Sequence, residues 1–353
     1  MAKILHGSSE LPSVVIDSYN LELRDENGGF IGDRGSKRAF QAILEDWRSR
    51  VSQADEDGED PFGDVATKSI GKKKLDRAFI EGDAEAAGLL LGAVEDFAQD
   101  LAAVTRRFVR AKGWKSTERI VVGGGMSDSR LGQLAIGRAA ILLKTSGVDV
   151  ELRPIRHHPD EAGLIGAGHL MPSWMFEGHD SFLAVDIGGT NIRVGIIRHR
   201  LAEKSDMSLA EVWKSELWRH ADEKPKPSRT AAVERLVEML TGLIDRAQAR
   251  NLRLAPFIGV GCPGIILEDG TIERGGQNLP GGNWESKRFN LPAALTDAIP
   301  TIGDHDTVVC VHNDAVVQGL SEVPFNQDVE RWGVLTIGTG LGNARFTNRG
   351  DKG

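Results

Sequence analysis

Apolar positions recur along this chain with two different periods, and the two kinds of segment follow one another throughout. Apolar residues at three- and four-residue spacing predict helices over residues 75–112, 131–143, 159–170 and 230–248, the first with a break near Gly82-Asp83. Shorter apolar runs, such as "RIVVGGG", "VDVELRPI", "FIGVGCPG" and "TVVCVHNDA", predict strands. Strands and helices mixed in this order predict an α/β protein.

Glycines mark three further features of the pattern. Two apolar runs, "FLAVDIGGTNIRVGIIR" and "WGVLTIGTGLGNARF", pass through glycines into a second strand, so each predicts a β-hairpin. Gly163, Gly166 and Gly168 predict close packing of the 159–170 helix. Residues 46–64, by contrast, are acidic and poor in apolar side chains, which predicts a solvated loop within a domain.

Length and composition narrow the class of protein. A chain of 353 residues is long enough to form two domains. The net charge of −8 disfavours a nucleic-acid-binding surface but leaves ATP binding open, because glycine amides and a metal ion can hold phosphate locally. The two cysteines, Cys262 and Cys310, are too few for a disulfide framework or a multi-cysteine zinc site and suit a reducing cytoplasm. With no signal peptide and no long apolar run, we expect a cytoplasmic protein without a membrane partner.

The segment "DIGGTN" carries the strongest chemical signal. Glycines at a hairpin turn let backbone N–H groups approach phosphate oxygens, and the carboxylate of Asp186 before them can hold a metal-bound water. The segment "IGTGLGN", residues 337–343, repeats the arrangement roughly a domain's length later. Two such hairpins suggest two related lobes that grip one polyphosphate, whereas either alone is satisfied by an ordinary turn.

Two other segments add chemistry. In "HNDA", Asn313 and Asp314 follow an apolar strand, where a carboxylate can accept a proton from a substrate hydroxyl; the alternative is that Asp314 only caps the next helix. In "VVGGGMS", a strand runs into Gly124 and Gly125, which suggests a nucleotide pocket. Trp284 is open between packing and sugar stacking.

Together these motifs resemble the ROK family of sugar kinases, within the actin/hexokinase/heat-shock ATPase superfamily. "DIGGTN" and "GTGLG" are similar to its two phosphate loops, "GCPG" and "GGQNLPGGNW" to its sugar-side segments, and "HNDA" to the sequence of its catalytic aspartate. The remaining family motifs lie in the N-terminal half of this chain, before "DIGGTN". There, "FIEGDAEAAGLLLGAVEDFAQDLAAV" resembles a helix pair, "RIVVGGGMS" the adenosine loop, and "DEAGLIGAGHL" the last helix. "SSELPSVVID" resembles the segment that contains a sugar-binding glutamate, here Glu10.

The order of these motifs predicts a circular permutation of the two-lobed, ribonuclease-H-like fold, which is tolerated when the old ends lie close together. Residues 1–158 are expected to form most of the large lobe, 159–330 the small lobe, and 331–353 the first hairpin of the large lobe. The short segment "MPSWMFEGHD" would join the old ends.

The resemblance implies an ATP- and Mg²⁺-dependent kinase that phosphorylates a sugar hydroxyl, most readily a hexose, with Asp314 as general base. Asn313, Glu10, Gly264 and Asn278 would bind the sugar, and Asp186 would hold magnesium through water. The nucleotide would be bound by Asp186, Gly188, Gly189, Thr190, Asn191, Gly338, Thr339, Gly340, Gly124 and Gly125.

Departures from the family keep alternatives open. Its histidine after the glutamate is Ser13 here, and its zinc motif is replaced by "DENGGFIGDRGSKRAF", so no structural zinc is expected. A non-catalytic sugar- or nucleotide-binding regulator on the same scaffold is therefore the rival prediction. The sugar, the donor (ATP or polyphosphate) and the oligomeric state stay open, with a homodimer as the family's indication.

Overall fold

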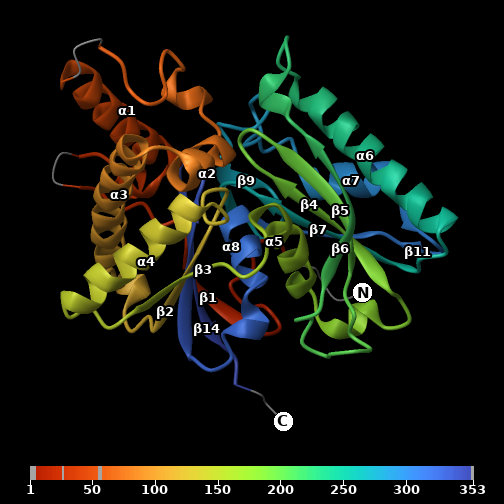
Figure 1. The fold of residues 1–353 in the computed structure, drawn as a ribbon. Coiled ribbons are helices and arrows are strands. Elements are labelled where there is room, and N and C mark those ends of the chain that lie inside the picture. Colours follow the sequence, from red (N-terminus) through yellow and green to blue (C-terminus); the bar gives the residue numbers. More distant parts are fainter. Residues whose placement is uncertain (1–4, 26–27, 55–57, 351–353) are drawn as a thin grey trace. The chain divides into compact units, whose positions relative to one another are not determined.

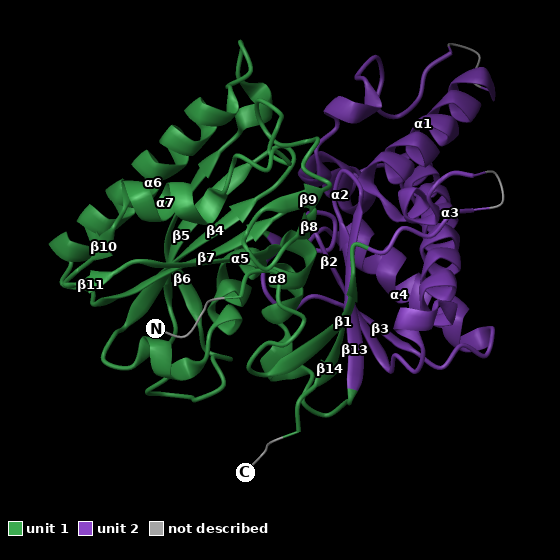
Figure 2. Ribbon diagram, turned by 180° about the vertical axis from the view of Figure 1, so that it is seen from behind, with its two compact units in different colours: residues 1–20, 160–330, 346–353 green, residues 21–159, 331–345 purple. Residues whose placement is uncertain are grey.

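A computed structural model describes residues 5–25, 28–54 and 58–350. The chain divides into two compact units (Figure 2). Unit 1 comprises residues 1–20, 160–330 and 346–353, and unit 2 comprises residues 21–159 and 331–345. Each unit is described by itself below.

Unit 1 is built on a five-stranded sheet with the order β12-β7-β4-β5-β6. Its central strand β4 pairs antiparallel with β5, which pairs antiparallel with β6, whereas β7 lies parallel to β4 and β12 parallel to β7. The strands are β4 (Ser181–Ile187), β5 (Ile192–Arg198), β6 (Glu211–Trp218), β7 (Leu254–Cys262) and β12 (Val308–Asn313). The hairpin β4–β5 is the one predicted around "DIGGTN".

Helices cover both faces of this sheet (Figure 1). Because successive side chains of a strand point to opposite faces, Leu183, Val185 and Ile187 pack in one core with α6 (Arg229–Ala249) and α7 (Leu291–Ala298). Phe182 and Asp186 point to the other face. The elements α5 (Pro159–Gly166), η4 (Ala167–Leu170) and α8 (Asp314–Leu320) belong to that face.

The predicted close packing on this face is confirmed. A Cβ on Gly166 would lie 1.8 Å from the carbonyl oxygen of Val317 in α8, and one on Gly168 would lie 2.8 Å from the ring of Phe182. A Cβ on Gly163 would come within 3.0 Å of the carboxyl carbon of Asp186. Larger side chains at these positions would push the helix away from the sheet.

Short elements complete unit 1. They are β8 (Ile265–Ile266), β9 (Ile272–Arg274), β10 (Thr301–Ile302), β11 (His305–Asp306), η5 (Ser173–Phe176), η6 (His220–Asp222) and η7 (Val323–Phe325).

A second five-stranded sheet has the order β1-β14-β13-β2-β3, and β13, β2 and β3 run parallel. Its strands are β1 (Val14–Tyr19), β2 (Arg119–Gly123), β3 (Glu151–Pro154), β13 (Arg331–Ile337) and β14 (Leu341–Asn348). The division into units assigns β1 and the last residues of β14 to unit 1 and the other strands to unit 2.

In unit 2, apolar side chains of β2 and β13 form one core with the long helix α3 (Ala84–Arg110) and with α4 (Arg130–Thr145) and α1 (Lys37–Ala54). The remaining elements of the unit are η1 (Ile31–Gly35), η2 (Thr67–Ser69), α2 (Lys72–Glu81) and η3 (Lys112–Trp114).

The predicted break near Gly82-Asp83 is confirmed between α2 and α3. The Asp83 carboxylate accepts a hydrogen bond from the backbone N–H of Ala86 at 2.8 Å and so caps α3. A Cβ on Gly82 would lie 2.2 Å from the carbonyl oxygen of Ala78, so only glycine closes α2 in this way.

The predicted loop over residues 46–64 is wrong in its first part, because α1 continues to Ala54. Phe40, Leu44 and the whole side chain of Arg48 are buried along one face of α1, with the Arg48 guanidinium paired to Asp60 at 2.9 Å. This buried face outweighs the polar composition of the other. Residues 55–57 of this prediction lie outside the described residues.

The division into units changes between residues 159 and 160 and between residues 330 and 331, and residues 5–20 group with unit 1. The backbone N–H of Gly7 donates to the carbonyl oxygen of Val311 at 3.0 Å, which fastens this segment to β12. Residues 346–350 likewise group with unit 1, since the Arg349 N–H donates to the carbonyl oxygen of Ser13 at 3.0 Å.

Helices that are both long and apolar enough to cross a membrane are absent from the described part of the chain.

Candidate functional site

The carboxyl ends of three parallel strands in unit 1 meet at one edge of the sheet. In the register, Asp186 of β4 lies opposite Gly261 of β7, and Asn313 of β12 lies opposite Cys262. Asp314 follows directly as the first residue of α8. The sheet therefore brings together two carboxylates that the sequence placed in different motifs.

Asn313 holds the turn between β12 and α8. Its Oδ1 accepts hydrogen bonds from the backbone N–H groups of Ala315 at 3.0 Å and Val316 at 3.2 Å, so Asn313 is the N-cap of α8. Its Nδ2 donates to the carbonyl oxygen of Gly264 at 3.0 Å. Asn313, rather than Asp314, is therefore the N-cap of α8, although one Asp314 oxygen also accepts from the Ala315 N–H at 2.9 Å.

Burial and a second charge perturb both carboxylates. Burial, together with the negative charge of Asp186, raises the pKa of Asp314 to about 7. Burial also raises the pKa of Asp186, against the opposing effect of the Arg193 guanidinium, which lies 3.7 Å from its carboxylate. Burial and both carboxylates raise the pKa of the Cys262 thiol. A carboxyl group that titrates near neutrality can accept and release a proton under physiological conditions.

The "DIGGTN" loop forms the tight turn between β4 and β5. The Gly188 N–H donates to the carbonyl oxygen of Asn191 at 2.8 Å. A Cβ on Gly189 would lie 3.3 Å from Cβ of Asn278, so the loop abuts the segment predicted to border the sugar. The carbonyl oxygen of Thr190 accepts from the Ala221 N–H at 3.2 Å.

One partner of this loop has no local signal in the sequence. Nε2 of the buried His220 lies 3.0 Å from the carbonyl oxygen of Gly188, and its ring packs edge-on against Trp218. A histidine in a short 3-10 helix carries no local pattern, and only the pairing of β5 with β6 brings it to the loop.

Gly264 sits in a crowded turn that requires glycine. Its φ is 104°, and a Cβ would lie 2.4 Å from the carbonyl oxygen of Arg274. Gly275, with φ of 97°, has its own Cβ position 2.6 Å from Cα of Gly264. The "GCPG" and "GGQNLPGGNW" segments are thus in direct contact, as two sides of one turn region.

Trp284, left open by the sequence, is a core residue. It is buried, its Nε1 donates to the carbonyl oxygen of Pro280 at 2.7 Å, and its ring packs edge-on against Phe289. A side chain fully enclosed in this way has no face left for a sugar.

In unit 2, the two remaining glycine loops touch each other. Gly124 has φ of 86°, and a Cβ there would lie 2.3 Å from the carbonyl oxygen of Ile337, directly before Gly338. The Gly338 N–H donates to the carbonyl oxygen of Gly340 at 2.9 Å, which closes the second turn around Thr339. Gly125 faces open space.

A lysine that the sequence did not single out lies beside this loop. Nζ of Lys72 is 2.6 Å from both carboxylate oxygens of Asp128 and 3.4 Å from the carbonyl oxygen of Gly125. His158 contacts the same carboxylate at 3.1 Å.

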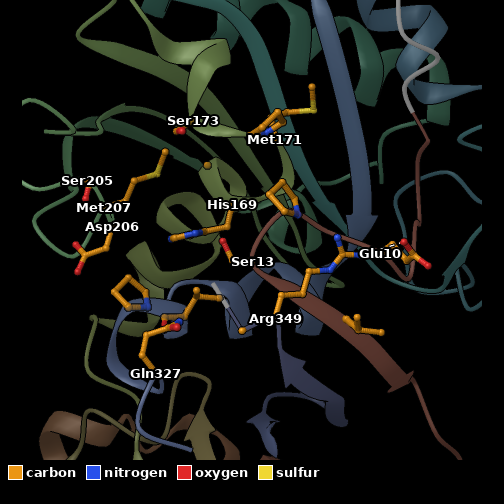
Figure 3. A pocket seen from close by; sticks show the side chains of 17 residues that line it. Glu10, Ser13, His169, Met171, Ser173, Ser205, Asp206, Met207, Gln327 and Arg349 are labelled. Atoms are coloured by element: carbon orange, nitrogen blue, oxygen red, sulfur yellow. Dashed lines mark hydrogen bonds and ion pairs between the residues drawn. The ribbon is translucent and has the colours of Figure 1, made fainter. Parts of the chain in front are cut away.

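Glu10 lines a cavity of about 970 Å³ in unit 1 (Figure 3). Its carboxylate pairs with Arg349 at 2.9 Å, and its side chain is 75% exposed. Ser13, His169 and Asp206 also line this cavity. The described lining residues include neither Asn313 nor Asp314, nor Gly264 and Asn278, so this cavity does not unite Glu10 with the other predicted sugar-binding residues.

Groups of three or more His, Cys, Asp or Glu side chains that could hold a metal are absent from the part of the chain that the structure describes.

The chain matches no protein-family model and no curated protein. Among solved structures it is similar to the ROK hexokinase from Thermus thermophilus, with 22% identity and a TM-score of 0.32, over 46% of this chain and 45% of that one. It is similar to an inorganic polyphosphate/ATP-glucomannokinase from an Arthrobacter species, with 22% identity and a TM-score of 0.33, over 48% of this chain and 62% of that one. A PPX-GPPA enzyme from Aquifex aeolicus matches at 12% identity and a TM-score of 0.31, over 66% and 83% of the two chains. The chain thus covers less than two thirds of both sugar-kinase structures, and any function rests on the geometry of its own site.

Proposed function

We propose that this chain is a sugar kinase of the ROK type that transfers a phosphoryl group from ATP to a sugar hydroxyl. One observation carries the proposal: Asp186 near the end of β4 and Asp314 directly after β12 flank β7 at one edge of the unit 1 sheet, beside a glycine turn, and burial with the charge of Asp186 raises the pKa of Asp314 to about 7. Phosphoryl transfer needs a base at the acceptor hydroxyl and hydrogen-bond donors at the phosphates. In this proposal Asp314 is the base, and the backbone N–H groups of the glycine turn are the donors.

Asp314 accepts the proton of the sugar hydroxyl in this proposal. The Asn313 side chain, fixed between Gly264 and the start of α8, holds the base in place. Asn278, packed against Gly189, borders both the sugar and the phosphates.

The phosphates are assigned to the glycine loops. In unit 1, the N–H groups of residues 188–191 bind them, and in unit 2 those of residues 338–340. Gly124 and Gly125 are assigned to the adenosine. Asp186 is the carboxylate that would hold Mg²⁺, and the ion would supply positive charge against the charge that develops on the phosphates.

The circular permutation is part of the proposal. The unit 1 sheet reads fifth-fourth-first-second-third in chain order, β12-β7-β4-β5-β6. Read from its other end, the second sheet is β3-β2-β13-β14-β1. This order has the same fifth-fourth-first-second-third pattern only if β13 is counted first, β14 second and β1 third. The bonds of Arg349 to Ser13 and Glu10 support a chain path in which β1 once followed β14.

A screen for ADP release tests the function. The full chain is incubated with ATP, Mg²⁺ and, one at a time, hexoses, amino sugars and polyols, with polyphosphate as a parallel donor. We expect turnover with at least one sugar and a loss of at least about 100-fold in kcat for Asp314→Asn, because general-base catalysis typically contributes that much. ATP binding without turnover on any sugar refutes the kinase and favours a sugar- or nucleotide-binding regulator.

A further inference from the structure

His312 lies directly before Asn313 and Asp314 in the chain, and its side chain is buried. It is 1% exposed, and its ring packs edge-on against Tyr19 with 5.3 Å between centroids. The Tyr19 hydroxyl donates to the carbonyl oxygen of Ile266 at 3.4 Å, which fixes the aromatic partner in turn. The proposed mechanism gives this histidine no role.

Both ring nitrogens of His312 are engaged, and together they define its tautomer. Nδ1 accepts a hydrogen bond from the backbone N–H of Asn313 at 2.7 Å. Nε2 lies 3.1 Å from the carbonyl oxygen of Ser8, so Nε2 bears the proton and donates it to that oxygen. Burial lowers the pKa of His312 to about 4, which keeps the ring neutral in this form at neutral pH.

The bond to Ser8 reaches a segment that carries Glu10. The Ser8 hydroxyl donates to the carbonyl oxygen of Glu10 at 3.0 Å and accepts from the Glu10 N–H at 3.1 Å. Alongside, Gly7 donates to the carbonyl oxygen of Val311, and the Val311 N–H donates to Nδ1 of His6 at 3.3 Å. Residues 6–8 therefore lie along β12, whereas Glu10 pairs with Val15 of β1. The His312 side chain links Ser8 to the Asn313-Asp314 turn.

We propose that His312 is a positioning residue that holds residues 8–10 in register with the turn of Asn313 and Asp314. For its kinetic consequence the inference rests on the proposed function, with Glu10 in the sugar-binding role that its sequence motif predicts. One nitrogen then serves the Glu10 segment and sugar affinity, and the other serves the turn and the rate. Because Asn and Gln place an amide near Nδ1 and Nε2 respectively, two substitutions separate the two bonds.

His312→Asn keeps an acceptor for the Asn313 N–H and loses the donor to Ser8. We expect KM for the sugar to rise roughly tenfold with kcat changed less than about threefold, the size of effect that loss of one hydrogen bond typically has. His312→Gln keeps the donor to Ser8 and loses the acceptor for the Asn313 N–H. We expect the reverse split, with kcat reduced roughly tenfold and KM nearly unchanged.

His199 supplies a matched control in the same unit. It is also buried, its Nδ1 accepts from the Leu201 N–H at 3.1 Å, and its Nε2 lies 2.9 Å from the carbonyl oxygen of His179. His199→Asn and His199→Gln remove comparable bonds away from the proposed site. We expect them to change thermal stability as the His312 variants do, without the selective change in KM or in kcat.

Hydrogen–deuterium exchange tests, without any substrate, whether His312 holds residues 8–10 in place. Amides of residues 7–10 should exchange faster in His312→Asn than in His312→Gln or wild type. Equal exchange in the two variants, or identical KM and kcat changes in both, overturns the inference. If the wild type turns over no sugar, the proposed function fails, and the exchange comparison still decides whether His312 holds this segment.

Discussion

Asp186 and Asp314 stand at the ends of β4 and β12, on either side of β7, and the charge of one raises the pKa of the other. The two residues come from motifs that lie far apart in the sequence. The parallel register of β4, β7 and β12 makes them neighbours, and burial makes their electrostatic interaction strong.

This coupling predicts the pH dependence of catalysis. In the proposed mechanism Asp314 acts as a base only when ionised, so kcat/KM should fall with unit slope as pH drops below about 7, the pKa to which burial and Asp186 raise it. Asp186→Asn removes the like charge and should lower the pKa of Asp314, which NMR titration of its carboxyl carbon measures. An Asp314 pKa that is the same in wild type and in this variant would contradict the coupling.

The same pKa predicts the pH dependence of stability. Because the folded pKa of Asp314 lies above its unfolded value of 3.8, the folded state binds the extra proton, and its stabilising contribution is lost as pH rises from about 4 through about 7. Asp314→Asn keeps an acceptor for the Ala315 N–H and removes this loss. Between pH 5 and pH 8 the variant should gain on the order of 2 kcal/mol relative to wild type in urea unfolding. Parallel stability curves for the two proteins would exclude a raised pKa.

The contact between the glycine loops of unit 2 predicts unequal effects at adjacent positions. Gly124→Ala places a Cβ 2.3 Å from the carbonyl oxygen of Ile337 at a φ of 86° and should destabilise the chain by about 2 kcal/mol or more. Gly125→Ala is the matched comparison, because open space surrounds that position, and it should cost less than about 1 kcal/mol. Thermal unfolding measures both, and equal losses would argue against the loop contact.

The proposed permutation predicts that the chain tolerates a second one. A chain in which residue 350 is linked to residue 5, and which is opened within residues 171–180, should fold cooperatively and keep the proposed sugar kinase activity. As a control, opening the chain within β4 should abolish folding, since β4 pairs with both β5 and β7. A relinked chain that fails to fold with several linker lengths would refute the proposed chain path.

The sequence by itself determined the elements whose signal is local. Apolar alternation and glycines located the hairpin β4–β5, a helical period located α6, and Gly82-Asp83 marked the break between α2 and α3. These predictions succeed because a strand, a cap or a turn is decided by residues within a few positions of one another.

The tertiary structure alone decided which distant groups meet. It grouped residues 5–20 with unit 1, joined Ser8 to His312, brought His220 to the Gly188 loop and put Glu10 on a cavity lined by neither Asn313 nor Asp314. Strand order and register set these contacts, and the energy of a pairing between remote segments depends on packing and burial across the whole unit. No local period in the sequence encodes that dependence.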